Sequence, residues 1–300
     1  MYDIIIIGGG PAGLTAAIYA RRAGKKVAVL EKSVFGGQIT FSPKVENIPG
    51  FVSVTGNEFA EKLVEQALEQ GVDFEMTTAL KIKNGPVKTV VTEDGEFEAP
   101  AVIIATGAKH RLIGLEGEEE LIGEGISFCA VCDGAFFKGK DVAVIGGGNS
   151  ALQEALQLSE IVSHVYIVQN LDFLTGEEML CRQIEEKDNI EVIMSSVVVG
   201  LIGEKSLEGI VIENAKDGSR MELDIDGMFI AIGLVPQNEP FADVIKLDGR
   251  GYADYDENCT TESDGIFVAG DCRRKNIRQV TTAAADGAVA ALAACRYLDS

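Results

Sequence analysis

The feature that most constrains this chain is an internal repeat. Residues 3–31 read DIIIIGGGPAGLTAAIYARRAGKKVAVLE and residues 141–169 read DVAVIGGGNSALQEALQLSEIVSHVYIVQ, so the two segments align without a gap. Each begins with a short apolar strand, passes through a glycine-rich turn into a segment of helical periodicity, and ends in a second apolar strand. Two such units predict an α/β chain with two doubly wound, Rossmann-like nucleotide-binding folds.

The first repeat carries a complete dinucleotide fingerprint. Its turn contains Gly8, Gly10, Pro11, Ala12 and Gly13. The glycines permit a tight turn, close approach of backbone to a pyrophosphate, and close packing of helix on strand. The helix N-terminus offers free N–H groups to phosphates. Glu31 ends the second strand, where a carboxylate accepts hydrogen bonds from ribose hydroxyls. The first repeat therefore predicts a dinucleotide site.

The second repeat keeps the turn but changes the residues around it. Its turn and helix start contain Gly146, Gly148, Asn149, Ser150 and Ala151. The position equivalent to Glu31 is Gln169, and residues 167–178 contain no Arg or Lys. The second fold therefore has a phosphate turn and candidate nucleotide residues, but it lacks both the usual ribose acid and the cations that pair with a 2′-phosphate.

The remaining segments fit two folds of the same plan. The pattern predicts helices over 56–71 and 281–298, and strands at 102–107, 228–233 and 266–269. Residues 72–98 and 190–232 alternate apolar and polar residues between glycine turns, which predicts a small antiparallel β insert in each half. The acidic run 116–120 is expected to be a solvated loop or helix face.

Composition excludes several classes of protein. The 300 residues include 47 acidic and 26 basic ones, for a net charge of −21, which disfavours binding to nucleic acid or to anionic membranes. No run of 18 apolar residues suggests a membrane span, and the N-terminal apolar run lacks the basic flank of a signal peptide. We therefore expect a cytoplasmic protein of two domains.

Cys129-Ala-Val-Cys132-Asp133 is the candidate reactive motif. A zinc site would need two more ligands at similar spacing, whereas no second CxxC exists and the histidines are His110 and His164. No metal site is predicted, and a redox dithiol is favoured over a structural pair. The two intervening residues let the sulfurs close a small disulfide ring beside a helix start. Asp133 can exchange the proton that thiol–disulfide chemistry requires, cap the helix, or do both.

With CAVCDG before the second glycine turn, the whole chain resembles the low-molecular-weight thioredoxin reductases. The resemblance implies FAD at the first fold, held by residues from four further segments besides Gly8–Gly13 and Glu31. The first segment contains Gly37 and Gln38, and the second contains Asn47. The third contains Ala105, Thr106 and Gly107. The fourth contains Gly270 and Asp271 together with Arg278, Gln279 and Val280. It also implies that Cys129 and Cys132 form the redox disulfide, that Cys132 lies nearer the flavin, that Cys129 attacks the partner, and that Asp133 donates the proton.

The same resemblance implies an architecture and partners. The FAD domain would comprise residues 1–110 and 240–300, and an inserted pyridine-nucleotide-like domain, residues 111–239, would carry the disulfide. Crossings near His110–Leu112 and Asn238–Pro240 would form a hinge about which the inserted domain rotates. Relatives are homodimers with one FAD per subunit, and their electrons pass through flavin and disulfide to thioredoxin or a thioredoxin-like protein.

The sequence departs from the family where NADPH is bound. Members that use NADPH carry a basic His-Arg-Arg-x-x-x-Arg segment, whereas this chain reads QNLDFLT over residues 169–175. Three donors therefore stay open: NADPH bound through a distant residue, NADH bound through Gln169 or Asn170, and a protein such as ferredoxin. Two other functions also stay open, namely an FAD-dependent dithiol oxidase that uses oxygen and a flavin-binding redox sensor without turnover.

Overall fold

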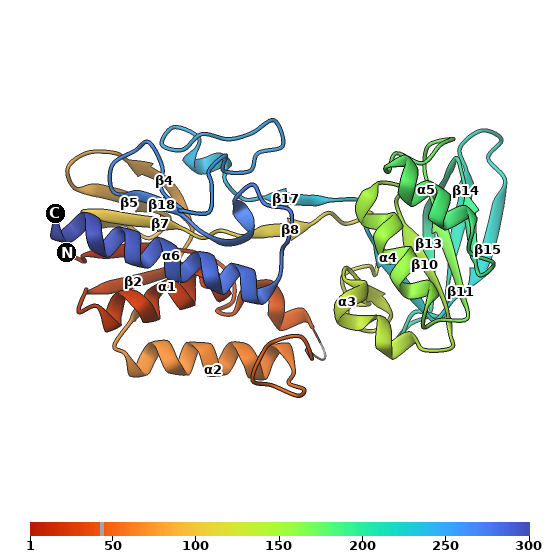
Figure 1. Ribbon diagram of the computed structural model, residues 1–300, viewed down its shortest axis with the longest axis horizontal. Helices are drawn as coiled ribbons and strands as arrows, with labels where there is room; N and C mark the ends of the chain where they lie inside the picture. Colours follow the sequence, from red (N-terminus) through yellow and green to blue (C-terminus); the bar gives the residue numbers. More distant parts are fainter. Residues whose placement is uncertain (43–44) are drawn as a thin grey trace. The chain divides into compact units, whose positions relative to one another are not determined.

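The computed structural model describes residues 1–42 and 45–300, which divide into two compact units (Figure 1). The first unit comprises residues 1–42, 48–109 and 235–300, and the second comprises 45–47 and 110–234. The chain passes between them in two strands that pair with each other, β8 (Ala108–His110) and β17 (Leu234–Pro236). Asn238–Pro240 therefore lie in the first unit, beyond this crossing.

The first unit is built on a parallel five-stranded sheet in the order β18-β7-β1-β2-β3. Its strands are β1 (Ile4–Ile7), β2 (Val27–Glu31), β3 (Asp73–Met76), β7 (Ala101–Ile104) and β18 (Ile266–Val268). Its helices are α1 (Pro11–Arg22), α2 (Gly56–Glu69) and α6 (Val280–Asp299), with 3₁₀ turns η1 (Gly37–Phe41), η3 (Glu239–Phe241) and η4 (Gly270–Cys272). An antiparallel insert consists of β4 (Ala79–Lys83), β5 (Lys88–Thr92) and β6 (Glu96–Ala99).

Strand β1 divides the core of this unit into two faces because successive side chains point to opposite sides of a strand. Ile4 and Ile6 pack with the apolar residues of α1 and α6, whereas Ile5 and Ile7 pack with the β insert and Phe241. A run of four fully apolar residues is thus what a strand covered on both faces requires.

The second unit repeats this plan around a parallel sheet in the order β12-β11-β10-β16-β9. Its strands are β9 (Ile126–Ser127), β10 (Asp141–Ile145), β11 (His164–Val168), β12 (Ile190–Ile193) and β16 (Gly227–Ile230). Its helices are α3 (Ala130–Asp133), α4 (Asn149–Ser159) and α5 (Glu178–Glu185), with the 3₁₀ turn η2 (Gly134–Phe137). Its antiparallel insert is β13 (Ser196–Ile202), β14 (Gly209–Asn214) and β15 (Arg220–Asp224).

The predicted fold class is confirmed, and the correspondence between the repeats extends to single residues. Helices α1 and α4 start at equivalent positions, Pro11 and Asn149. The extent of the β inserts was wrong, because the first strand of each expected insert joins a parallel sheet instead. Strand β3 pairs with β2, and β12 pairs with β11.

The expectation for the acidic run 116–120 was wrong at its centre. Glu118 is buried, and its carboxylate accepts hydrogen bonds from the backbone N–H groups of Ile113, Gly114 and Leu115 at 2.7–3.1 Å. Three backbone donors replace the water that a buried carboxylate loses, so Glu118 organises the loop that follows the crossing.

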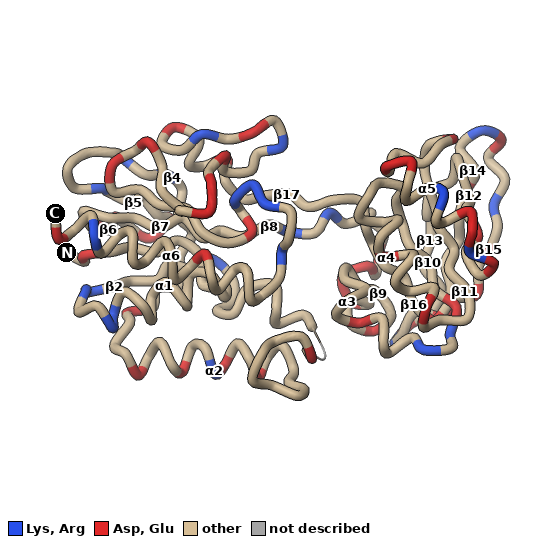
Figure 2. Tube along the Cα trace, in the orientation of Figure 1, with Lys and Arg blue, Asp and Glu red and all other residues tan. Residues whose placement is uncertain are grey.

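Acidic side chains occur along the chain in both units, in keeping with the net charge of −21 (Figure 2). Within residues 1–42 and 45–300, no helix combines the length and the apolar character that crossing a bilayer requires.

Close contact between α1 and α6 gives a test of this packing. A Cβ atom on Gly287 of α6 would lie 2.1 Å from the Ala12 carbonyl oxygen, so Gly287→Ala must push the helices apart. We expect the free energy of unfolding to fall by about 1–3 kcal/mol in denaturant titrations. Gly249→Ala is the control, because no atom lies within 4 Å of its added Cβ. Equal stability of the two variants would contradict this packing.

Candidate functional site

Several segments of the first unit meet at the turn between β1 and α1. A Cβ atom on Gly8 would lie 2.2 Å from the Ala105 carbonyl oxygen, and one on Gly37 would lie 3.0 Å from the Gly10 Cα. A Cβ on Gly270 would lie 2.7 Å from the Ala12 Cβ. These contacts bring together four separate segments that the sequence assigned to one site.

Helix α1 begins at this turn with its N–H groups free of any side-chain cap. Gly10 is the N-cap, and the nearest atoms to a Cβ placed there are 3.9 Å away. The first turn of α1 contains no acidic residue. An anion can therefore approach the positive end of the helix dipole and the backbone donors.

Glu31 closes the other side of this turn. Its Oε2 atom accepts the Gly9 N–H at 2.7 Å, and its Oε1 atom accepts the N–H groups of Lys32 and Ser33 at 2.9 and 3.0 Å. A cavity of about 290 Å³ adjoins it, lined by residues that include Gly8, Thr77, Thr106 and Phe241. The carboxylate is thus held at the mouth of a cavity at the carboxyl ends of the strands, where open α/β sheets bind ligands.

Asp271 brings an unsatisfied carboxylate to the same region. Its Oδ1 atom is buried and has no hydrogen-bond partner among the described residues. Burial raises the pKa of Asp271, and the charges of Lys275 and Arg278 partly oppose that rise. A buried acceptor without a donor is costly unless a ligand supplies one.

A buried ion-pair cluster holds the turn that carries Asp271. Asp286 of α6 accepts the Gly270 N–H at 3.0 Å and pairs with Arg273 and Lys275. Arg278 donates to the Asp271 carbonyl oxygen and lies over the Tyr252 ring. Gln279 and Val280 mark the start of α6, with Gln279 as its N-cap. The C-terminal residues predicted to bind FAD therefore lie together, in the turn at Gly270–Asp271 and at the start of α6.

One of the residues predicted to bind FAD, Asn47, does not fall in the first unit with the others. Asn47 belongs with the second unit, where its side-chain nitrogen lies 4.0 Å from Cys132 Sγ. Gln38 lies in η1, one residue after Gly37.

The second glycine turn has the same backbone and different side-chain chemistry. Gln169, unlike Glu31, is almost fully buried, and its amide donates to the Phe173 carbonyl oxygen at 3.0 Å. It packs against Gly147, where a Cβ would lie 2.6 Å from the Gln169 amide. Asn149 exchanges two hydrogen bonds with Glu177. Gly148 is the N-cap of α4, and Ser150 is an exposed residue of its first turn.

Glu154 is a partly buried acid of this fold that the sequence did not single out. It lies on α4, its Oε2 atom has no hydrogen-bond partner among the described residues, and burial raises its pKa from 4.5 to about 8. Glu154 lies three residues after Ala151 and four before Leu158, both buried, so helical periodicity is the signal that could have placed it beside the apolar face.

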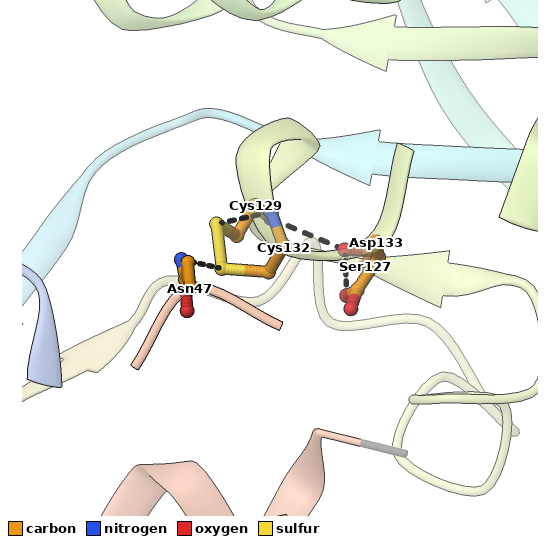
Figure 3. The surroundings of a disulfide bond; sticks show 5 residues. All are labelled: Asn47, Ser127, Cys129, Cys132 and Asp133. Atoms are coloured by element: carbon orange, nitrogen blue, oxygen red, sulfur yellow. Dashed lines mark hydrogen bonds between the residues drawn. A yellow bond between two sulfur atoms is a disulfide. The ribbon is translucent and has the colours of Figure 1, made fainter. Parts of the chain in front are cut away.

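The cysteine pair forms the second candidate centre (Figure 3). Cys129 and Cys132 are joined by a disulfide, with Cα atoms 5.3 Å apart, and Cys129 is the N-cap of α3. The Cys132 N–H donates to the Cys129 sulfur at 3.2 Å. Thus the short helix α3 places both sulfur atoms at its first turn.

Asp133 lies at the end of α3 and is mostly buried. Its Oδ2 atom accepts a hydrogen bond from Ser127 Oγ at 2.6 Å, while its Oδ1 atom is buried without a partner among the described residues (Figure 3). Burial raises the pKa of Asp133, and the Ser127 hydrogen bond opposes that rise. Because burial favours its neutral form, Asp133 is a candidate proton donor.

Ser127 was missed by sequence reasoning. It precedes Cys129 by two residues, a spacing that has no established meaning in sequence, and its role depends on the turn that brings β9 back to α3. The free cysteines include Cys259 and Cys272, which are buried, and burial raises the pKa of the Cys259 thiol to about 12.

Several known proteins resemble this chain along its whole length. The family model described as "Pyridine nucleotide-disulphide oxidoreductase" matches residues 2–287. A "34.2 kDa protein in rubredoxin operon" of Clostridium pasteurianum is 43% identical over 99% of this chain and 97% of that protein. The thioredoxin reductase of Bacillus subtilis strain 168 is 38% identical over 100% of this chain and 95% of that protein. The crystal structure of thioredoxin reductase from Streptococcus pyogenes superposes with a TM-score of 0.94 at 40% identity, covering 100% and 98% of the two chains.

The raised pKa of Glu154 predicts a pH-dependent stability. The folded protein keeps this proton up to about pH 8, whereas the unfolded chain releases it near pH 4.5. Between these values folding takes up a proton, so stability falls as pH rises, by up to about 1.4 kcal/mol per pH unit. Glu154→Gln removes this dependence. In thermal unfolding, the variant should gain on the parent from pH 5 to pH 8 and keep its advantage above pH 8.

Glu120→Gln is the matched control, because Glu120 is an exposed acid of the same unit. A constant difference between Glu154→Gln and the parent protein across this pH range would show that Glu154 ionises normally in the folded state.

Proposed function

We propose a function for this chain, which belongs to the pyridine nucleotide-disulphide oxidoreductase family: it is an FAD-dependent disulfide reductase that passes electrons through flavin and the Cys129–Cys132 pair to thioredoxin or a thioredoxin-like protein. The observation that carries the proposal is the disulfide at the start of α3 with the partly unsatisfied, buried carboxyl group of Asp133 at the other end of that short helix. A redox pair and a proton donor are what thiol–disulfide exchange requires.

The first unit fits FAD by three observations. Gly10 leaves room for a pyrophosphate at an uncapped helix start, and Glu31 lies where a ribose would need an acceptor. Asp271 Oδ1 needs a donor that the described residues do not supply, and a ribityl hydroxyl would provide one. We therefore assign FAD to the predicted residues around this turn, with Arg278, Gln279 and Val280 facing the ring system. When bound, FAD supplies the two electrons that convert the Cys129–Cys132 disulfide into thiols, with uptake of two protons.

The chain's own residues then carry the exchange with the partner. The Cys129 thiolate attacks the partner's disulfide, so that a bond forms between Cys129 and one partner sulfur while the partner's own sulfur–sulfur bond breaks. The other partner sulfur leaves with the electron pair and takes a proton from Asp133. Asp133 then removes the proton of Cys132, whose thiolate attacks Cys129, breaks the mixed disulfide and reforms the Cys129–Cys132 bond. The second partner sulfur leaves as a thiolate and takes up the proton that Cys129 released earlier. Two electrons have moved from the pair to the partner.

Replacing Cys132 separates flavin binding from disulfide chemistry. Cys132→Ser should retain the flavin absorbance, because Cys132 is not among the residues assigned to hold FAD, and should lose disulfide reduction, because no second sulfur can close the cycle. The measurement is turnover of thioredoxin under anaerobic conditions with dithionite as reductant. Cys181→Ser, a change at a free cysteine of the same unit, is the control. Turnover by Cys132→Ser at the parent rate would refute the mechanism.

The second unit fits a pyridine nucleotide less well than the first fits FAD. Asn170, Leu171 and Thr175 stand where NADPH-using relatives carry arginines, and Gln169 already satisfies its amide within the protein. Loss of two charge-assisted contacts to a 2′-phosphate costs about 3–5 kcal/mol, which weakens affinity by roughly two to four orders of magnitude. We therefore propose that NADPH is a poor donor, and that NADH or a ferredoxin-like protein reduces the flavin.

Anaerobic stopped-flow mixing tests the donor directly. Bleaching of the flavin should be slow or absent with micromolar NADPH and faster with NADH or reduced ferredoxin, each tested in parallel on the same holoenzyme. The physical reason is the missing cationic contact to the 2′-phosphate. Fast bleaching at micromolar NADPH would overturn this assignment and leave the disulfide chemistry untouched.

We also propose a homodimer with one FAD per subunit, as in relatives of this size, acting in the cytoplasm, where thiols are kept reduced. Light scattering of the holoenzyme measures its mass and so tests the homodimer. No nucleic acid or membrane partner is proposed, given the acidic net charge.

A further inference from the structure

We propose that Ser127 is a positioning residue of the redox centre: its hydroxyl group holds the Asp133 carboxyl group through Oδ2 and leaves Oδ1 as the oxygen that carries and donates the proton. This inference rests on the proposed function, because it assigns how the proton donor of that function is oriented. Ser127 touches Asp133 and the backbone of Cys129, and it acts through them.

The hydrogen bonds of Ser127 fix the direction in which its proton points. A serine hydroxyl has one hydrogen and two acceptor lone pairs. The Cys129 N–H donates to Ser127 Oγ at 3.1 Å, so one lone pair is occupied. Ser127 Oγ in turn lies 2.6 Å from Asp133 Oδ2, which leaves its hydrogen for that oxygen (Figure 3). When Asp133 is protonated, its own proton therefore resides on Oδ1.

Ser127 is itself held rigidly, which is what a positioning residue requires. It is 5% exposed and lies at the end of β9, where Ser127 pairs with Phe229 of β16. Phe229 is fully buried in the core of the second unit. The contact thus ties the last residue of the four-residue helix α3 to the sheet, and a carboxyl group anchored through a strand loses little entropy when it reacts.

The hydrogen bond also opposes the effect of burial on Asp133. Burial favours the neutral acid, whereas donation from Ser127 favours the carboxylate. Without the Ser127 hydroxyl group, Asp133 would hold its proton more tightly, and its carboxyl group would no longer be fixed in one orientation. Among neighbouring elements, α4 packs against α3 and carries Glu154, and the segment with Asn47 carries Glu46, so both carboxylates belong in the test.

The experiment compares Ser127→Ala with Ser127→Thr, which keeps the hydroxyl group, in the flavin-loaded protein reduced with dithionite. Two probe disulfides are used: cystine, whose alkyl thiolate needs a proton to leave, and an aryl disulfide, dithiobis(nitrobenzoate), whose thiolate is stable without one. Ser127→Ala should slow cystine reduction about tenfold and change reduction of the aryl disulfide less than about twofold. Ser127→Thr should restore most of the cystine rate.

The pH profile gives a readout that a purely structural role would not move. The falling limb of the cystine rate reports deprotonation of the acid, and in Ser127→Ala it should shift to higher pH. Ser196→Ala is the matched control, because Ser196 is equally buried in the same unit and donates only to a backbone carbonyl. It should leave both the rates and the profile unchanged. Glu154→Gln and Glu46→Gln should each leave the profile of the parent unchanged and, when combined with Ser127→Ala, should leave the shift in place.

A direct titration separates this inference from the proposed function. Carbon-13 NMR of the oxidised holoenzyme labelled at aspartate Cγ, assigned with Asp133→Asn, should show a higher pKa for Asp133 in Ser127→Ala. An unchanged titration, equal slowing with both probe disulfides, or failure of Ser127→Thr to restore the rate would each overturn the role of Ser127. If the parent protein reduces no disulfide at all, the proposed function fails, while this titration still decides whether Ser127 governs Asp133.

Discussion

The close approach of α1 to β1 is the constraint on which the first unit depends. A Cβ atom on Gly13 would lie 1.9 Å from the Gly8 carbonyl oxygen, so no side chain fits between strand and helix. This contact lets the helix begin directly above the strand end, with its N–H groups uncapped. The strand-end segment at Ala105 and the C-terminal turn at Gly270 then reach the same few atoms. Backbone proximity, rather than any one side chain, therefore assembles the cofactor region.

The two repeats show how one backbone plan supports different chemistry. At equivalent positions, Glu31 offers a carboxylate at a cavity mouth, whereas Gln169 is buried against Gly147 with its amide satisfied internally. Each side chain contacts its own glycine turn, Glu31 at Gly9 and Gln169 at Gly147, so the turn keeps its support whether the residue is Glu or Gln. Only an acid in this place also leaves a negative acceptor for a ribose. The glycine turn of the second repeat can therefore be retained in a protein whose electron donor is not NADPH.

Much of this was predictable because the signals are local. The repeat, the helix starts and the CxxC pair follow from residues close in sequence, and the structure confirms the fold class that they indicate. What escaped prediction depends on distant partners. Strands β3 and β12 read as parts of an insert because a strand of four residues does not reveal which strand it pairs with. Glu118 and Ser127 gain their roles from turns that fold back on them, and Glu154 is partly buried although glutamate is ordinarily exposed.

The order of the strands has a consequence for the order in which the protein can fold as it is synthesised. The sheet of the second unit is complete once β16 ends at Ile230, whereas the first sheet still lacks its edge strand β18, which ends at Val268. The face of α1 that packs against α6 stays uncovered until α6 has been made. The earliest residues to leave the ribosome therefore belong to the last core to close, with an interval in which that core relies on chaperones or on partial packing.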